Sequence, residues 1–167
     1  MDMKGLIRIA FAVVAALILF LWLKPSESKR IRKVFATVSR ELRKDGPEGV
    51  VVSAAKARAL AELVAPDARI DLDGEFMRVA NDRQLAQSII LVRRQCDKIE
   101  VGFSDIAIAF TDGDTASVTA DVYVRGLSEA LDISGRDARE VETVLVKDKD
   151  EGKWRFKSVR LVPVVEK

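Results

Sequence analysis

The longest hydrophobic stretch of the chain lies close to its N-terminus, where residues 9–23 form an unbroken apolar run, IAFAVVAALILFLWL. Taken over residues 5–23, the stretch reaches the roughly 20 residues that a helix needs to cross a bilayer. A cleaved signal peptide is the alternative, but no A-x-A-like site follows Trp22. The pattern therefore predicts an N-terminal transmembrane anchor over residues 1–25 that contacts the membrane through residues 5–23. One domain is expected over residues 26–167.

The basic residues on either side of the run bear on its orientation. Lys4 and Arg8 precede it, and a larger group of cations follows it. By the positive-inside rule this imbalance favours a cytoplasmic domain. A short basic tail before an apolar run is, however, typical of bacterial anchors whose N-terminus stays in the cytoplasm. We favour this second interpretation, a single-pass protein of the bacterial inner membrane with its domain in the periplasm. The cations after the run are Lys24, Lys29, Arg30, Arg32 and Lys33.

Apolar residues at helical spacing predict three helices in the first part of the domain. The first ends near Lys44, the second begins at Ser53, and the third is capped by Asn81 or Asp82 and runs to about Gln95. The other face of the first helix is basic, and we expect it to be solvated, with contact to anionic headgroups as the alternative. The buried stripes are Ile31, Val34, Phe35, Val38 and Leu42 in the first helix and Leu85, Ile89, Val92 and Cys96 in the third.

The rest of the chain alternates apolar and polar residues, as strands do. A short strand is expected over residues 68–73, and a loop follows from Gly74. Longer strands are expected over residues 99–110, 116–124, 136–149 and 154–161, with a hairpin turn at Asp112-Gly113.

Two of these strands slip in phase by one residue, at Ser104-Asp105 and at Lys157-Ser158. A slip of one residue predicts a β-bulge, and bulges bend a strand. Helices come first and strands later, which predicts an α+β fold. We expect three N-terminal helices packed on a strongly bent antiparallel sheet, preceded by the transmembrane helix.

The composition excludes several kinds of chemistry. The chain has no histidine and one cysteine, Cys96, so it lacks the ligands of a zinc site and any Ser-His or Cys-His pair. Cys96 is expected to be a small buried residue. The net charge of +2 does not indicate a nucleic-acid-binding protein. No cofactor is expected.

Three short stretches resemble the NTF2-like superfamily, which includes the SnoaL-like cyclases and the ketosteroid isomerases. Residues 63–70, LVAPDARI, are similar to the family's entry into its first strand. Residues 81–90 resemble the helix that follows, and Gly152-Lys153-Trp154-Arg155-Phe156 resembles the closing strand. The resemblance covers about residues 31–164 and implies the NTF2-like cone.

The family's catalytic residues do not carry over. The resemblance places the aspartate base of the isomerase-like members near Leu72 and the tyrosine of their first helix at Phe35, and neither side chain can do that chemistry. Cyclase-like members often use a histidine, which this chain lacks. The resemblance therefore implies a fold rather than an activity.

The remaining candidate site residues are few. Asp105 is a weak catalytic candidate, because the bulge beside it could turn its side chain inward, although a solvated position is favoured. Four aromatic residues could line a pocket at the mouth of the cone, although core positions are favoured for them as well. They are Phe35, Phe76, Phe103 and Trp154.

Several carboxylates stand in pairs two residues apart. Asp71 and Asp73 could hold a cation, but their alternation with apolar residues places them away from the core. Turn chemistry explains Asp112 and Asp114. Glu140 and Glu142 are expected to pair across strands with Arg125 or Arg155.

These observations favour a membrane-anchored, non-catalytic NTF2-like domain. It would act in scaffolding, through a protein partner or as a homodimer through the sheet, or would hold an apolar small molecule. The alternative is a SnoaL-like isomerase or cyclase that uses a non-standard carboxylate such as Asp105.

Overall fold

The computed structural model describes residues 26–72, 75–79, 81–128 and 133–162. The chain divides into two compact units, residues 1–30 and residues 31–167. Within the described residues, no helix is long and apolar enough to cross a membrane. The predicted anchor over residues 1–25 lies outside them.

Helices form close to the three predicted positions, as α2 (Glu27–Leu42), α3 (Val50–Ala61) and α4 (Asp82–Gln95). α2 buries Ile31 and Phe35, which lie one turn apart on its apolar stripe. Asn81 caps α4 as predicted, because its side-chain oxygen accepts a hydrogen bond from the Gln84 amide at 2.8 Å.

Two details of the predicted helices are wrong. α3 begins at Val50 rather than at Ser53, because Ser53 belongs to the buried face of the helix together with Ala57 and Ala61. In α4 the predicted residues Leu85, Ile89 and Cys96 are half-buried, but Val92 does not belong to the buried side. Val92 is 55% exposed, whereas its neighbour Arg93 is only 1% exposed.

Seven strands are found among the described residues, and they form one sheet in the order β1-β4-β5-β6-β7-β2-β3. Neighbouring strands are antiparallel except β2 and β7, which run parallel, so the prediction of an antiparallel sheet is wrong at this pair. Two short strands, β1 and β3, were not predicted, and β3 falls where a loop was expected, because strands this short carry almost no alternation. The strands are β1 (Lys44–Asp45), β2 (Val64–Leu72), β3 (Glu75–Arg78), β4 (Lys98–Phe110), β5 (Thr115–Ser128), β6 (Ile133–Lys147) and β7 (Trp154–Leu161).

Both predicted bulges are confirmed. The register between β4 and β5 shifts between Ser104 and Ala107, and Asp105 has a left-handed backbone with φ of 50°. The register between β6 and β7 skips Lys157. β2 contains a third irregularity at Asp67, with φ of 58°, where its register with β7 shifts. The strand starts at Val64, before the predicted residue 68, because Val64 already pairs with Phe156 of β7.

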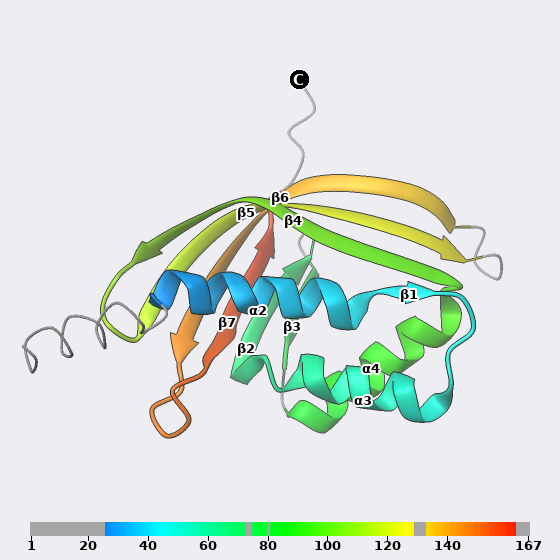
Figure 1. Ribbon diagram of the computed structural model, residues 1–167, viewed down its shortest axis with the longest axis horizontal. Coiled ribbons are helices and arrows are strands. Elements are labelled where there is room, and N and C mark those ends of the chain that lie inside the picture. Colours follow the sequence, from blue (N-terminus) through cyan, green and yellow to red (C-terminus); the bar gives the residue numbers. More distant parts are fainter. Residues whose placement is uncertain (1–25, 73–74, 80, 129–132, 163–167) are drawn as a thin grey trace, which may run out of the picture. The chain divides into compact units, whose positions relative to one another are not determined.

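The sheet is curved, and α2, α3 and α4 lie on its concave side (Figure 1). The main core cluster lies between α2 and this side of β5, β6 and β7. The opposite side of β4, β5 and β6, called the outer face below, is covered by no helix of the described ranges (Figure 1). Residues of the main cluster are Ile31, Phe35, Ala116, Val118, Leu145, Trp154 and Phe156.

Candidate functional site

Three of the four aromatic residues predicted to line a pocket, Phe35, Phe103 and Trp154, belong to the main core cluster or pack against it. Phe35 and Trp154 are 1% and 3% exposed and belong to the core. The Phe35 ring meets Phe103 edge-on, with ring centroids 5.0 Å apart, and meets Phe156 in the same way at 5.3 Å. Phe76 lies apart from them, 63% exposed on the edge strand β3. The rings of Phe35, Phe103 and Phe156 thus pack together beside α2.

The weak catalytic candidate Asp105 lies at the bulge of β4, and it is exposed. The next carbonyl, that of Ile106, accepts a hydrogen bond from Arg32 of α2 at 2.9 Å. This contact ties α2 to the free edge of β4. Neither the bulge nor the exposed position brings Asp105 to the packed side of the sheet.

The paired carboxylates have structural surroundings. Asp71 lies beside Arg160 in the register of β2 and β7, on the outer side, and Asp73 lies outside the described residues. Asp112 Oδ1 accepts a hydrogen bond from the backbone amide of Asp114 at 2.8 Å, as turn chemistry predicts. Glu142 pairs with Arg160 at 2.6 Å rather than with Arg125 or Arg155, so the predicted partner is wrong.

The most extensive polar cluster surrounds Arg93, the arginine on the buried face of α4. Its guanidinium reaches the carbonyls of Glu41, Leu42 and Arg43 at 2.9, 2.8 and 3.3 Å, which closes the C-terminal end of α2. Glu48 accepts from the same guanidinium at 2.6 and 3.1 Å. These contacts engage all five donors of an arginine, so Arg93 acts as a structural cap.

The cap is reciprocal. Lys44, immediately after α2, donates from Nζ to the carbonyls of Arg93 and Cys96, at the C-terminal end of α4, at 2.7 and 2.5 Å. Each helix therefore supplies a cation to the end of the other, where the helix dipole favours positive charge. Sequence patterns predicted neither contact, because Arg93 and Lys44 are far apart in the chain.

Ionisation in this cluster is shifted by its contacts. Burial raises the pKa of Glu48, but hydrogen bonds from Lys56 and Arg93 and their charges outweigh it, so the pKa lies below its ordinary value. The distance from Lys56 Nζ to Glu48 Oε1 is 2.7 Å.

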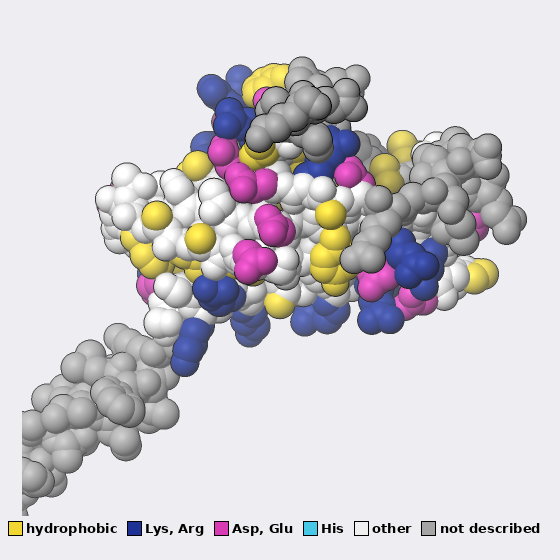
Figure 2. All heavy atoms as spheres, turned by 90° about the horizontal axis from the view of Figure 1, so that it is seen from above, with side chains coloured by type: hydrophobic (Ala, Val, Ile, Leu, Met, Phe, Trp, Pro, Cys, Tyr) yellow, Lys and Arg dark blue, Asp and Glu magenta, His cyan; other side chains and the backbone are white. Residues whose placement is uncertain are grey.

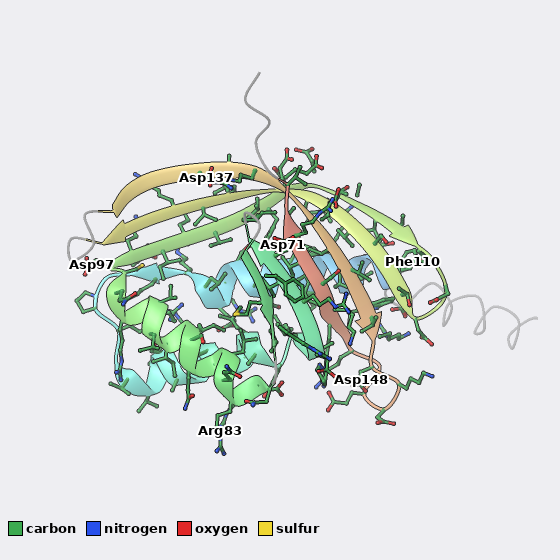
Figure 3. All side chains as sticks on the ribbon, turned by 180° about the vertical axis from the view of Figure 1, so that it is seen from behind. Asp71, Arg83, Asp97, Phe110, Asp137 and Asp148 are labelled. Carbon is green, nitrogen blue, oxygen red and sulfur yellow. The ribbon has the colours of Figure 1, made fainter. Side chains whose placement is uncertain are left out.

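A second carboxylate with a lowered pKa lies in a turn. In the turn between β6 and β7, amides of Glu151 and Asp150 lower the pKa of Asp148 by donating to it. Figure 3 shows Asp71, Asp97, Asp137 and Asp148 at separate places on the domain. Within the described ranges, no three Asp, Glu or Cys residues are grouped so that they could hold a metal ion.

The outer face carries a shallow depression of about 320 Å³ over the middle of β4, β5 and β6. Small side chains, among them Ala107, Ala109, Ser117 and Thr119, line it together with Glu142. A second groove, of about 390 Å³, runs between α3 and α4, with alanines in its lining and with charged residues of both signs.

Several acidic side chains lie near the middle of the outer face (Figure 2). Asp121 of β5 lies directly opposite Glu140 of β6 in the register, and both are exposed. Opposed like charges destabilise a sheet. No described cation forms an ion pair with either carboxylate. This pair is the clearest feature of the surface that folding alone does not explain.

No family model and no curated protein matches this chain. Several solved structures, however, are similar to this chain. A scytalone dehydratase-like protein from Novosphingobium aromaticivorans superposes with a TM-score of 0.63 at 16% identity, over 83% of this chain and 85% of that one. LinA superposes with a TM-score of 0.61 at 14% identity, over 82% of this chain and 85% of LinA. ActVI-ORFA from Streptomyces coelicolor superposes with a TM-score of 0.60 at 10% identity, over 83% of this chain and 97% of that one. These likenesses show the fold, and they agree with the predicted NTF2-like cone.

Proposed function

We propose that this NTF2-like domain is a membrane-anchored, non-catalytic scaffold that binds a protein partner on the outer face of its sheet. The observation that carries the proposal is the outer face itself. It joins a depression lined by small side chains to the exposed pair Asp121 and Glu140, and no described helix covers it.

The side chains of this face suit a close contact between proteins. Alanine, serine and threonine let another backbone approach closely, and they lose little side-chain entropy when they are buried. The depression lies between the β4–β5 and β5–β6 pairings, where the sheet is regular apart from the bulge. A partner that covers it would bury the face without any rearrangement of the core.

The charge of the face favours a partner with lysine or arginine. A cation placed between Asp121 and Glu140 would relieve their repulsion, which the isolated domain leaves in place. A second copy docked face to face across a two-fold axis at this pair would bring two such pairs together. A basic surface of another protein is therefore a better complement than a homodimer.

The concave side gives less support to the other functions considered. Aromatic rings fill the region beside α2, and Asp105 is exposed at a bulge of the edge strand. An isomerase or cyclase needs a proton-transferring group beside a bound substrate. Native mass spectrometry of the protein from detergent-solubilised membranes remains the direct test for a retained apolar molecule.

The test is site-specific photo-crosslinking in cells that make the full chain. A photoreactive residue at Thr119 should yield one discrete adduct, identified by mass spectrometry as a different protein. The same residue at Ala55, exposed on α3, serves as the control and should not yield it. A Thr119 adduct of two copies of this chain, or no adduct at all, would contradict the proposal.

Charge-neutral variants sharpen the result. Asp121→Asn with Glu140→Gln should abolish the adduct and raise the free energy of unfolding by about 0.2–1 kcal/mol, because the repulsion disappears. Glu62→Gln, an exposed carboxylate at the end of α3, should change neither quantity. Loss of the adduct together with loss of stability would indicate a folding defect instead of a lost contact.

A further inference from the structure

Charge is unevenly distributed along the chain. Residues 26–45, which include α2, contain seven Lys or Arg and three Asp or Glu. Residues 46–167 contain 18 Lys or Arg and 22 Asp or Glu. Residues 26–45 thus have a net charge of +4 and residues 46–167 one of −4, so the total of +2 equals the net charge of residues 1–25 and conceals a basic α2 beside an acidic remainder. Such an asymmetry points to an anionic surface that contacts the basic part.

The cations of α2 are concentrated in its first two turns and are exposed. Ile31, between them, is fully buried, so packing fixes the rotation of the helix and keeps the cations on the outside. Lys29 and Lys33, one turn apart, have no ion-pair partner among the described residues. Arg30 is paired with Glu27 at 3.4 Å, and Arg32 is held by the Ile106 carbonyl.

The connection between the apolar run and α2 is short. Only residues 24–26 separate its last residue, Leu23, from the start of α2 at Glu27. Fully extended, this connection spans at most about 14 Å. The headgroup zone is about 5–7 Å deep on each side of a bilayer, and charges interact over about 8 Å at physiological salt. If the run spans a membrane, the start of α2 is therefore within reach of the headgroups.

We propose that the first two turns of α2, through Lys29 and Lys33 above all, bind the headgroups of anionic phospholipids. The proposal rests on the anchor proposed above. Each lysine or arginine near an anionic surface gains about 1 kcal/mol, a factor of about five in binding. The acidic remainder of the domain gains nothing from the same surface, so the contact also orients the domain with α2 toward the lipid.

The experiment uses the full chain in nanodiscs made of phosphatidylcholine alone or with about a third of phosphatidylglycerol, a composition that supplies an anionic surface. Hydrogen–deuterium exchange is measured for the first two turns of α2. With the anionic lipid, we expect these amides to exchange at least fivefold more slowly, and 0.5 M salt should remove the difference.

Variants assign the effect to the lysines. Lys29→Gln with Lys33→Gln should abolish the lipid-dependent slowing. Lys149→Gln with Arg83→Gln, two exposed cations in the β6–β7 turn and at the start of α4, should preserve it. Equal exchange in both nanodiscs, or slowing that survives the lysine variants, would overturn the proposal.

Resistance to alkaline carbonate extraction tests the anchor separately. A protein that resists extraction but shows no dependence on lipid charge would leave the anchor standing and refute the headgroup contact. A protein released by carbonate would refute the anchor instead.

Discussion

A fully buried arginine on α4 joins the C-terminal end of α2 to α4. Arginine is a cationic side chain, and a buried charge is tolerated only when it is paired and hydrogen-bonded. Glu48 supplies the opposite charge, and the end of α2 supplies three carbonyls that would otherwise lack partners. Burial of the arginine is thereby offset by groups that themselves needed donors.

Removing Arg93 should be costly. Arg93→Ala leaves Glu48 and the α2 carbonyls without their donors, so we expect the free energy of unfolding to fall by about 3–5 kcal/mol. Arg94→Ala, at the exposed neighbouring position, should change it by less than about 0.5 kcal/mol. Urea unfolding of the full chain in detergent measures both. Similar losses for the two variants would refute the capping role.

The same cluster should make stability depend on pH. The folded-state pKa of Glu48 is lower than its ordinary value of 4.5, so its stabilising contribution is present above about pH 4.5. It is lost as the pH falls through the lower, folded-state pKa, because the unfolded chain then binds the proton more readily.

We therefore expect the difference in unfolding free energy between the wild type and Glu48→Gln to shrink on acidification below about pH 4.5. Glu62→Gln, at an exposed position beyond the end of α3, is the matched control variant. Denaturation series at several pH values supply the measurement. A wild-type advantage over Glu48→Gln that grows in acid would have the wrong sign.

At the scale of the elements, the pairing of β4 with β5 contains one tight packing arrangement. Gly102 lies opposite Tyr123, and the tyrosine ring covers the glycine so closely that a Cβ there would overlap it. Gly102 is buried, whereas Tyr123 is 36% exposed. An aromatic residue laid over a strand glycine shields backbone that the glycine cannot cover.

Gly102→Ala should force the Tyr123 ring away and lower the free energy of unfolding by about 1–3 kcal/mol. Combined with Tyr123→Ala, the glycine substitution should cost clearly less, because the overlap no longer exists. A double-mutant cycle in urea measures this coupling. Additive losses would show that the ring adapts without strain.

Alternation of apolar and polar residues was a sound guide to the long strands and to both bulges. It works because a residue pair that breaks phase, such as Ser104-Asp105, must either leave the ladder or turn the following side chains over. The same pattern cannot say which strands become neighbours. The parallel contact of β2 with β7 joins segments distant in the chain, and it escaped prediction for that reason.

At the scale of the whole molecule, the α+β class and the helices on one side of a curved sheet followed from the order of the elements. The positions of Arg93, Asp121 and Glu140 could not be predicted from that order. A period of apolar residues assigned Val92 to the core, yet Arg93 occupies that place because its partners come from α2 and the next loop. The opposition of Asp121 and Glu140 likewise depends on a register that the sequence alone leaves open.

The reciprocal caps have a consequence for how the domain opens. Arg93 holds the end of α2 and Lys44 holds the end of α4, so neither helix can fray at that end without breaking contacts of the other. The two helix ends should therefore belong to one cooperative unit and share a single opening free energy. Their slowest amides would then exchange through the same rare excursion of the native state, even though the two helices belong to distant parts of the sequence.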